Sequence, residues 1–322
     1  MNATTRRVVL ALAVVAVVTV SIVTIQNALI DRYFVSLPRF VTDFSVTYFE
    51  RNMHELQRQP PHVVFIGDSV LWGFALDPAD TAVASLARNG CRCTNFAFKS
   101  GSPPNFYVMA RAIEAAQLHP QAIVLEVNEK VFNESDPSYD HLHPAIEALA
   151  GPYLNPTERA TLHVEPTRAG PKSTLDSALT RTMLLYAMRS DIRETLYGDV
   201  PDPIAKPTTD QLEGVYDLSP LSNENVGIQF LEKTFAVFQR AKIPVVAFLT
   251  PTNHALLHEY IDNPSYRSNL HFLSELARAH GAKILDLDSV FEPRYFIDGD
   301  HLTAAGQTRL ASTLAREIPV DR

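Results

Sequence analysis

The chain has 322 residues, of which 46% are hydrophobic and 20% are charged, and its formal net charge at pH 7 is −8. This composition supplies one sizeable hydrophobic core and differs from the polar composition of disordered proteins. The acidic balance argues against nucleic acid as a partner, because phosphate binding needs a basic face. We therefore expect one globular domain with appendages.

An apolar run from Val8 to Ile25 lies near the N-terminus and is long enough to cross a bilayer as a helix. Arg6 and Arg7 precede it, which predicts a cytoplasmic amino end and a periplasmic or otherwise extracytoplasmic location for the rest of the chain. A cleaved signal peptide is the alternative. It is disfavoured because the run is long and no clear small-x-small cleavage site follows it. The sequence thus predicts a single-pass anchor over residues 1–30, with the lipid bilayer as its partner.

A stem over residues 31–60 is predicted to join the anchor to the main domain. Phe40, Phe44 and Tyr48 recur at four-residue spacing and would line one face of a helix. That face could rest in the membrane interface or on the domain. Packing on the domain is the favoured interpretation.

Residues 61–322 form the predicted main domain, in which apolar strands alternate with amphipathic helices. Strands are predicted at 63–66, 94–98, 122–127, 244–249 and 283–287. Helices are predicted at 81–88, 105–118, 224–241, 268–280 and 303–318. This alternation predicts an α/β fold, a flavodoxin-like three-layer α/β/α sandwich whose mostly parallel sheet is covered on both faces.

Between the third and fourth predicted strands the alternation fails and prolines accumulate, which indicates an insertion over residues 132–223. One helix is predicted inside it, capped by Ser173 or Thr174. Its apolar positions are Leu175, Leu179, Leu185, Met188, Ile192 and Leu196. An insertion at this point would lie beside a site at the strand ends, so it could act as a lid or acceptor-binding cap. Mere decoration of the fold is the alternative.

Polar residues follow several of the predicted strands. Gly67-Asp68-Ser69 ends the first, Gly101 and Asn128 follow the second and third, and Asp298 and His301 come after the last. The carboxyl ends of parallel strands meet at one edge of a sheet, so we expect these residues to lie together. Gly-Asp-Ser alone is a common turn sequence. With a histidine to take its proton and an acid to hold the imidazole, however, the serine can act as a nucleophile.

The order of these motifs resembles the SGNH (GDSL-like) hydrolase superfamily over about residues 62–316. The resemblance implies that Ser69 is the nucleophile, that His301 is its general base and that Asp298 stabilises the imidazolium. Asp298 is preferred to Asp300 because the family motif is Asp-x-x-His, and Asp300 is interpreted as a turn residue. A serine mechanism of this kind needs no cofactor and no metal.

The resemblance also implies an oxyanion hole made of the backbone amides of Ser69 and Gly101 and the side chain of Asn128. Ser100 is the alternative to Gly101. The third family block usually reads Gly-x-Asn-Asp, whereas this chain has Glu126-Val127-Asn128-Glu129. The amide donor is kept, and a turn-forming role is the alternative for Asn128.

Three further residues are candidates for substrate contact: Trp72, Asn253 and His254. Trp72 follows the proposed nucleophile by three residues and could wall an acyl pocket, although core packing is the favoured role. Asn253 and His254 lie in a polar loop after the fourth predicted strand. For this pair, surface solvation is an equal alternative.

The histidine pairs do not indicate a metal site. His254 and His258 have i,i+4 spacing, and His141 and His143 lie beside Asp140. Neither group has a clear third ligand, and zinc sites need at least three.

Cys91 and Cys93 are the only cysteines, too few for a disulfide framework. In an extended segment their side chains would share a face, near the outer limit of disulfide reach. Two buried thiols are therefore favoured over a bridge.

The layout of anchor and insertion resembles that of membrane-anchored proteins of alginate O-acetylation and teichoic-acid D-alanylation. This resemblance implies an O-acetyltransferase or acetylesterase acting on an envelope glycan, with an acyl ester donor and a glycan hydroxyl acceptor. It also implies a multispanning membrane acyltransferase as a candidate partner. The alternatives are a simple esterase or lipase on small esters, and a catalytically silent glycan-binding scaffold. The anchor and the insertion favour transfer over hydrolysis.

Overall fold

The computed structural model describes residues 3–33, 49, 52–53, 56–58, 62–134, 140–164, 175, 179, 183–187 and 219–318. The predicted stem face of Phe40, Phe44 and Tyr48 lies outside the described residues. So does most of the helix predicted inside the insertion. Of that helix, Leu175 and Leu179 are helical, and α9 spans Leu184–Ala187.

Five parallel strands form the sheet at the centre of the domain, in the order β2-β1-β3-β4-β5. They are β1 Val63–Ile66, β2 Cys93–Asn95, β3 Ala122–Val127, β4 Val245–Leu249 and β5 Lys283–Asp286. Every residue of β1, β3 and β4 is buried, as expected for strands covered on both faces. β2 is shorter than predicted because Asn95 Oδ1 accepts a hydrogen bond from the Ala97 amide and closes a local turn after the strand.

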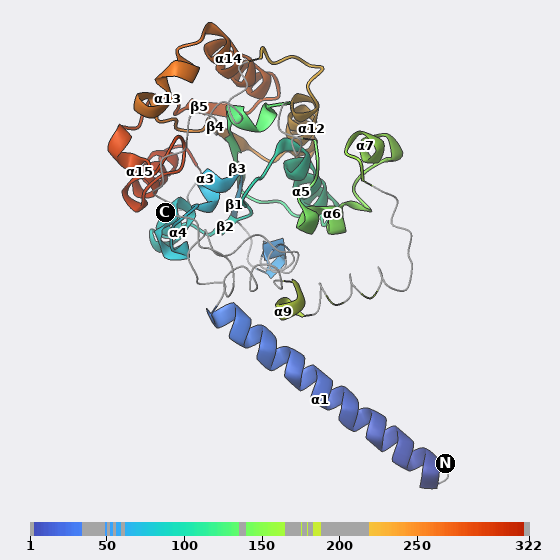
Figure 1. Ribbon diagram of the computed structural model, residues 1–322. Coiled ribbons are helices and arrows are strands. Elements are labelled where there is room, and N and C mark those ends of the chain that lie inside the picture. Colours follow the sequence, from blue (N-terminus) through green and yellow to red (C-terminus); the bar gives the residue numbers. More distant parts are fainter. Residues whose placement is uncertain are drawn as a thin grey trace.

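Helices cover both faces of the sheet (Figure 1), which confirms the predicted three-layer α/β/α fold. On one side α5 packs on α12 and α12 on α14, and on the other side α4 packs on α15. Their bounds are α4 Ala82–Arg88, α5 Pro103–Ala115, α12 Val226–Arg240, α14 Pro264–Ala279 and α15 Ala304–Leu314.

Helix boundaries follow local capping chemistry. α5 begins two residues earlier than predicted because Pro103 fits the first turn, where no backbone N–H is needed. Thr303 Oγ1 accepts a hydrogen bond from the Gly306 amide and caps α15. Asn225 does the same for α12 through the Ile228 amide. These caps fix where the helices that flank the strand ends begin.

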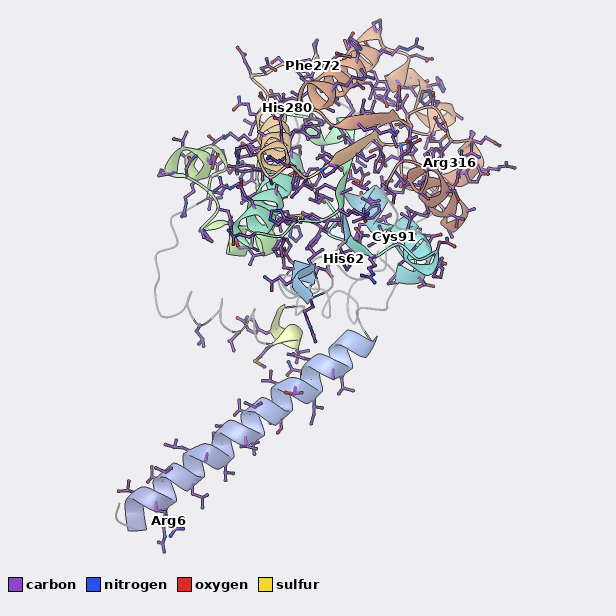
Figure 2. All side chains as sticks on the ribbon, turned by 180° about the vertical axis from the view of Figure 1, so that it is seen from behind. Arg6, His62, Cys91, Phe272, His280 and Arg316 are labelled. Carbon is purple, nitrogen blue, oxygen red and sulfur yellow. A yellow bond between two sulfur atoms is a disulfide. The ribbon has the colours of Figure 1, made fainter. Side chains whose placement is uncertain are left out.

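The N-terminal helix α1, Ala3–Tyr33, projects away from the α/β domain (Figures 1 and 2). Its 25-residue segment Thr5–Leu29 is long and apolar enough to cross a membrane, and none of its most apolar window is buried in the protein. A signal sequence near an N-terminus can meet the same criteria of length and composition. By length and composition, α1 fits a membrane anchor or a signal sequence.

The insertion contributes three described α-helices between β3 and α12: α6 Pro144–Ala150, α7 Pro156–Thr161 and α9. α6 packs on α5, and α9 lies against α1. Just before α6, the His143 amide donates to Asn105 Oδ1, and the His143 ring meets the Phe98 ring edge-on at a centroid distance of 5.0 Å. The insertion thus touches the segment around Gly101, where the sequence places one side of the site.

Cys91 and Cys93 form a disulfide, and the prediction of two thiols is wrong. Their Cα atoms are 5.4 Å apart, which lies within the range that a disulfide spans. Cys91, labelled in Figure 2, is buried beside the start of β2.

Candidate active site

Ser69, His301 and Asp298 are joined by hydrogen bonds at the carboxyl edge of the sheet. Ser69 begins the short helix α3, Ser69–Trp72, which follows β1 after Gly67 and the N-cap residue Asp68. His301 Nε2 lies 2.8 Å from Ser69 Oγ, and His301 Nδ1 lies 2.7 Å from Asp298 Oδ2. The structure therefore brings the three predicted triad residues together across 232 positions of sequence.

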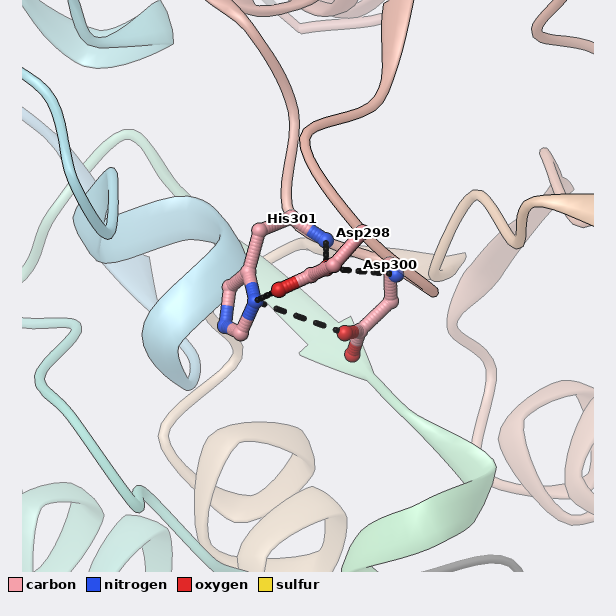
Figure 3. A group of neighbouring side chains, drawn as sticks. All are labelled: Asp298, Asp300 and His301. Carbon is pink, nitrogen blue, oxygen red and sulfur yellow. Dashed lines mark hydrogen bonds and ion pairs between the residues drawn. The ribbon is translucent and has the colours of Figure 1, made fainter. Parts of the chain in front are cut away.

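Asp298 holds His301 at two points, the imidazole and the backbone N–H (Figure 3). Its Oδ2 faces His301 Nδ1, and its Oδ1 accepts the His301 backbone N–H at 2.9 Å. Burial raises the pKa of Asp298, but the hydrogen bond and positive charge of His301 outweigh it, so the pKa lies below its ordinary value. An ionised Asp298 fixes the proton on Nδ1, which leaves Nε2 to accept the Ser69 hydroxyl proton.

The ring of Phe74 packs against the imidazole, with ring centroids 4.4 Å apart. Phe74 comes after Gly73, the C-cap residue of α3, and its amide donates to the Ser69 carbonyl. This contact restricts the rotation of the His301 ring. No local pattern indicates this contact, because a lone aromatic residue after a turn is equally typical of core packing.

Asp300 is a buried member of the site and not only the turn residue that the sequence suggested. Its amide does close a turn to Asp298 Oδ1, but its side chain forms an ion pair with Lys130 Nζ. Its Oδ1 also lies 3.7 Å from His301 Nδ1 (Figure 3). Burial raises the pKa of Asp300, whereas the charges of Lys130 and His301 and hydrogen bonds lower it further, to about 2. Asp300 is thus ionised and paired.

Asn128 connects this ion pair to the nucleophile turn. Its Nδ2 donates to both Asp68 Oδ2 and Asp300 Oδ2, each at 2.9 Å. Its Oδ1 accepts the Lys130 amide at 3.3 Å, which is the turn-forming role that the sequence left open. Both amide hydrogens are therefore engaged by carboxylates, so donation to an oxyanion requires one of these hydrogen bonds to be exchanged.

The Gly101 amide has a backbone acceptor in this structure. Its N–H donates to the Phe98 carbonyl at 3.1 Å, which closes a turn with Ser100 at a φ of 61°. Gly101 is required for another reason: a Cβ there would lie 2.5 Å from the Gly67 carbonyl oxygen. Within the part of the chain that the structure describes, no hydrogen bond engages the Ser69 amide, so this predicted donor is free.

The three candidates for substrate contact have structural partners. Trp72 is 1% exposed and belongs to the hydrophobic core, the favoured alternative. Asn253 Nδ2 donates to the Asp298 carbonyl, and its amide donates to the Gly299 carbonyl, so Asn253 braces the loop that carries the acid. His254 Nε2 lies 2.8 Å from Asp288 Oδ2.

Asp298, Asp300 and His301 lie close enough together to hold a cation. The surroundings do not fit one: Lys130 already supplies a positive charge to Asp300, and His301 Nδ1 is engaged by Asp298. The charge balance of the cluster is therefore met by protein groups.

Chemically, the arrangement has the parts of a serine acyl-transfer site, namely a hydroxyl, a base within hydrogen-bond reach and an ionised acid that orients the base. A family model matches residues 219–321, which include Asp298 and His301 but cover less than half of the chain. A comparison with curated proteins found no match to the sequence.

Several solved structures resemble the domain. A family two carbohydrate esterase from Clostridium thermocellum, in complex with cellohexaose, is 8% identical over 80% of this chain and 63% of its own, with a TM-score of 0.43. An acetyl xylan esterase is 11% identical over 80% of this chain and 100% of its own, with a TM-score of 0.41. A GDSL-like lipase from Bacteroides thetaiotaomicron VPI-5482 is 11% identical over 85% of this chain and 98% of its own, with a TM-score of 0.40. Similarity at this level does not by itself define a family or a substrate, so function is argued below from the site residues.

Proposed function

We propose that this protein is a membrane-anchored, extracytoplasmic serine acyl-transfer enzyme of the SGNH type, an O-acetyltransferase or acetylesterase acting on an envelope glycan. The observation that carries the proposal is the continuous hydrogen-bond chain from Ser69 Oγ through both ring nitrogens of His301 to Asp298 Oδ2. Such a chain serves to activate a hydroxyl group.

In the proposed reaction, Ser69 Oγ attacks the carbonyl carbon of an acyl ester while His301 Nε2 takes the hydroxyl proton. The new C–O bond forms, and the bond to the leaving alcohol breaks as His301 returns the proton to that alcohol. A second hydroxyl compound then attacks the acyl-serine, with His301 again as base. If this compound is water, the products are an acid and free Ser69; if it is a glycan hydroxyl, the acyl group is transferred.

Three features support the location and the acceptor. α1 has the composition of a membrane anchor, and Arg6 and Arg7 precede its apolar run, which favours a cytoplasmic amino end. The disulfide between Cys91 and Cys93 is typical of an oxidising compartment. The insertion touches the segment around Gly101, where a cap over an acceptor would lie. The acetyl group and the glycan are inferred from the resemblance of the anchor-plus-insertion layout.

Acetyl transfer by the full-length protein in detergent tests the proposal. An activated acetyl ester is supplied with and without an acetyl-accepting glycan, and Ser69→Ala is the control. We expect acetylated glycan with the wild type and none with Ser69→Ala. Release of acetate at the same rate with and without glycan would mean hydrolysis, and inactivity of the wild type towards every ester would favour a silent scaffold.

A further inference from the structure

We propose that Glu126, at the carboxyl end of β3, is a positioning residue that shapes the nucleophile turn and directs the Ser69 amide toward the oxyanion. This inference rests on the proposed acyl-transfer function. Nothing in the chemistry of the triad requires an acid at this position, and Glu126 lies where the family block that the chain resembles usually has glycine.

Glu126 binds the turn on both sides of Ser69. Its Oε2 accepts the Asp68 amide at 2.9 Å and the Leu71 amide at 3.2 Å. The Val70 amide donates to Asp68 Oδ1 at 2.9 Å. Of the four successive amides from Asp68 to Leu71, three therefore have fixed acceptors. The Ser69 amide is the one that, in the described structure, no hydrogen bond engages.

Gly67 lies next to Glu126 and leaves room for its carboxyl group. β1 and β3 are parallel neighbours in which Ile66 pairs with Leu125, so Gly67 lies opposite Glu126 at the point where both strands end. A Cβ on Gly67 would overlap Glu126 Oε2 and would lie 2.7 Å from Glu126 Cβ. The absent side chain at Gly67 thus leaves the space through which the carboxyl group reaches the two amides. The glycine of the Gly-Asp-Ser motif acquires a specific role in this chain.

The protein environment favours a neutral Glu126. The side chain is 1% exposed, and burial together with the nearby Asp68 raises the pKa of Glu126 well above its ordinary value. Its second oxygen, Oε1, lies 3.3 Å from Thr250 Oγ1 at the end of β4. A neutral carboxyl group has the shape and hydrogen-bonding pattern of a glutamine amide, since one oxygen accepts and the other group donates. Glu126→Gln is therefore the conservative variant that should preserve positioning.

Steady-state kinetics of full-length variants in detergent, with an activated acetyl ester, test the inference. Glu126→Leu keeps the approximate volume and removes the acceptor. We expect kcat to fall at least about 100-fold with KM within about threefold, because loss of a well-placed oxyanion donor affects the transition state. Glu126→Gln should stay within about threefold of the wild type. Glu158→Leu is the matched control, because Glu158 is also buried and hydrogen-bonded but lies on α7.

Hydrogen–deuterium exchange of residues 67–72 supplies a readout that does not depend on activity. The amide hydrogens of Asp68 and Leu71 should exchange faster in Glu126→Leu than in the wild type. Their exchange rates should be unchanged in Glu126→Gln and in Glu158→Leu. If Glu126→Leu does not fold, Gly67→Ala replaces it, since the added methyl displaces the carboxyl group; the expected result is again a fall in kcat at unchanged KM.

The inference fails if Glu126→Leu or Gly67→Ala matches Glu158→Leu in kcat and in exchange, or if Glu126→Gln loses as much activity as Glu126→Leu. If the wild type turns over no ester and Ser69 reacts with no fluorophosphonate, the proposed function fails instead. In that case the exchange of the Asp68 and Leu71 amides still decides whether Glu126 holds the turn.

Discussion

Replacing Asp300 by asparagine should lower the free energy of unfolding by about 3–5 kcal/mol, the range found when one partner of a buried ion pair is removed. The side chains of Asp300 and Lys130 are 7% and 17% exposed, so asparagine would leave the Lys130 charge largely buried and without its partner. The replacement keeps the volume and an oxygen that can accept the Asn128 amide. The predicted loss therefore comes from charge and not from a cavity.

The pH dependence of stability gives a separate estimate of how much the ionised form of Asp300 contributes to the free energy of unfolding. The pKa of Asp300 is lowered from an ordinary value of 3.8 to about 2, which corresponds to about 2 kcal/mol of stabilisation. Because the folded-state value is the lower one, this contribution is fully present above pH 4. It is lost progressively as the pH falls through about 4 and then about 2, and it vanishes only below both values, where the carboxyl group is protonated in the folded and the unfolded state. In Asp300→Asn this part of the acid-induced loss of stability should be absent.

Urea unfolding of the wild type, Asp300→Asn, Lys130→Met and the double variant, followed by circular dichroism at pH 7, measures the effect. We expect the double variant to be more stable than Asp300→Asn, since it removes the unpaired charge along with its partner. Glu275→Gln is the control: Glu275 forms an exposed ion pair with Arg278, and its loss should cost less than about 1 kcal/mol. Additive losses in the double variant would refute the reasoning.

Three further outcomes are expected. Asp298→Asn should lower kcat by about 10³–10⁴-fold with little change in KM, because the imidazole loses its ionised partner. Steady-state kinetics measure both constants. An unchanged kcat would exclude Asp298 as the acid of the triad. Asn128→Ala should destabilise the fold by about 1–3 kcal/mol, because the buried carboxylates of Asp68 and Asp300 each lose a hydrogen-bond donor. Thermal unfolding that matches the wild type would contradict this role of Asn128. The chain should stay in the membrane fraction after a carbonate wash, with an intact mass that includes Met1; a shortened, soluble product would instead indicate a cleaved signal sequence.

The fold was predictable largely because β1, β3 and β4 are short runs in which nearly every residue is apolar. β1 and β3 match the predicted bounds, and β4 and β5 differ by one residue at an end. β1, β3 and β4 are buried throughout, as parallel strands covered on both faces usually are. The pairing of Ser69 with His301 was also predictable, because both follow strands whose carboxyl ends meet at one edge. In both cases the signal lies in local sequence and in the order of segments.

The surroundings of the triad were less predictable, because they depend on contacts between distant segments. Lys130 and Asp300 are 170 positions apart, and neither a lysine nor an aspartate near a strand end indicates by itself a buried partner. The resemblance predicts the Gly101 amide as an oxyanion donor. Ser100, however, adopts a left-handed conformation that is rare for residues other than glycine, and the resulting turn engages that amide. Only the presence of Glu126 in place of glycine was visible beforehand, and its effect required the register of β1 and β3.

The central claim is that Ser69 carries the acyl group during the reaction. Full-length protein in detergent is mixed with an activated acetyl ester, quenched in acid during turnover and digested, and its peptides are analysed by mass spectrometry. We predict an acetyl group on the Ser69 side chain of the wild type, and its loss in both Ser69→Ala and His301→Ala. Turnover of the ester without acetylation of Ser69, or undiminished turnover by Ser69→Ala, would contradict the claim.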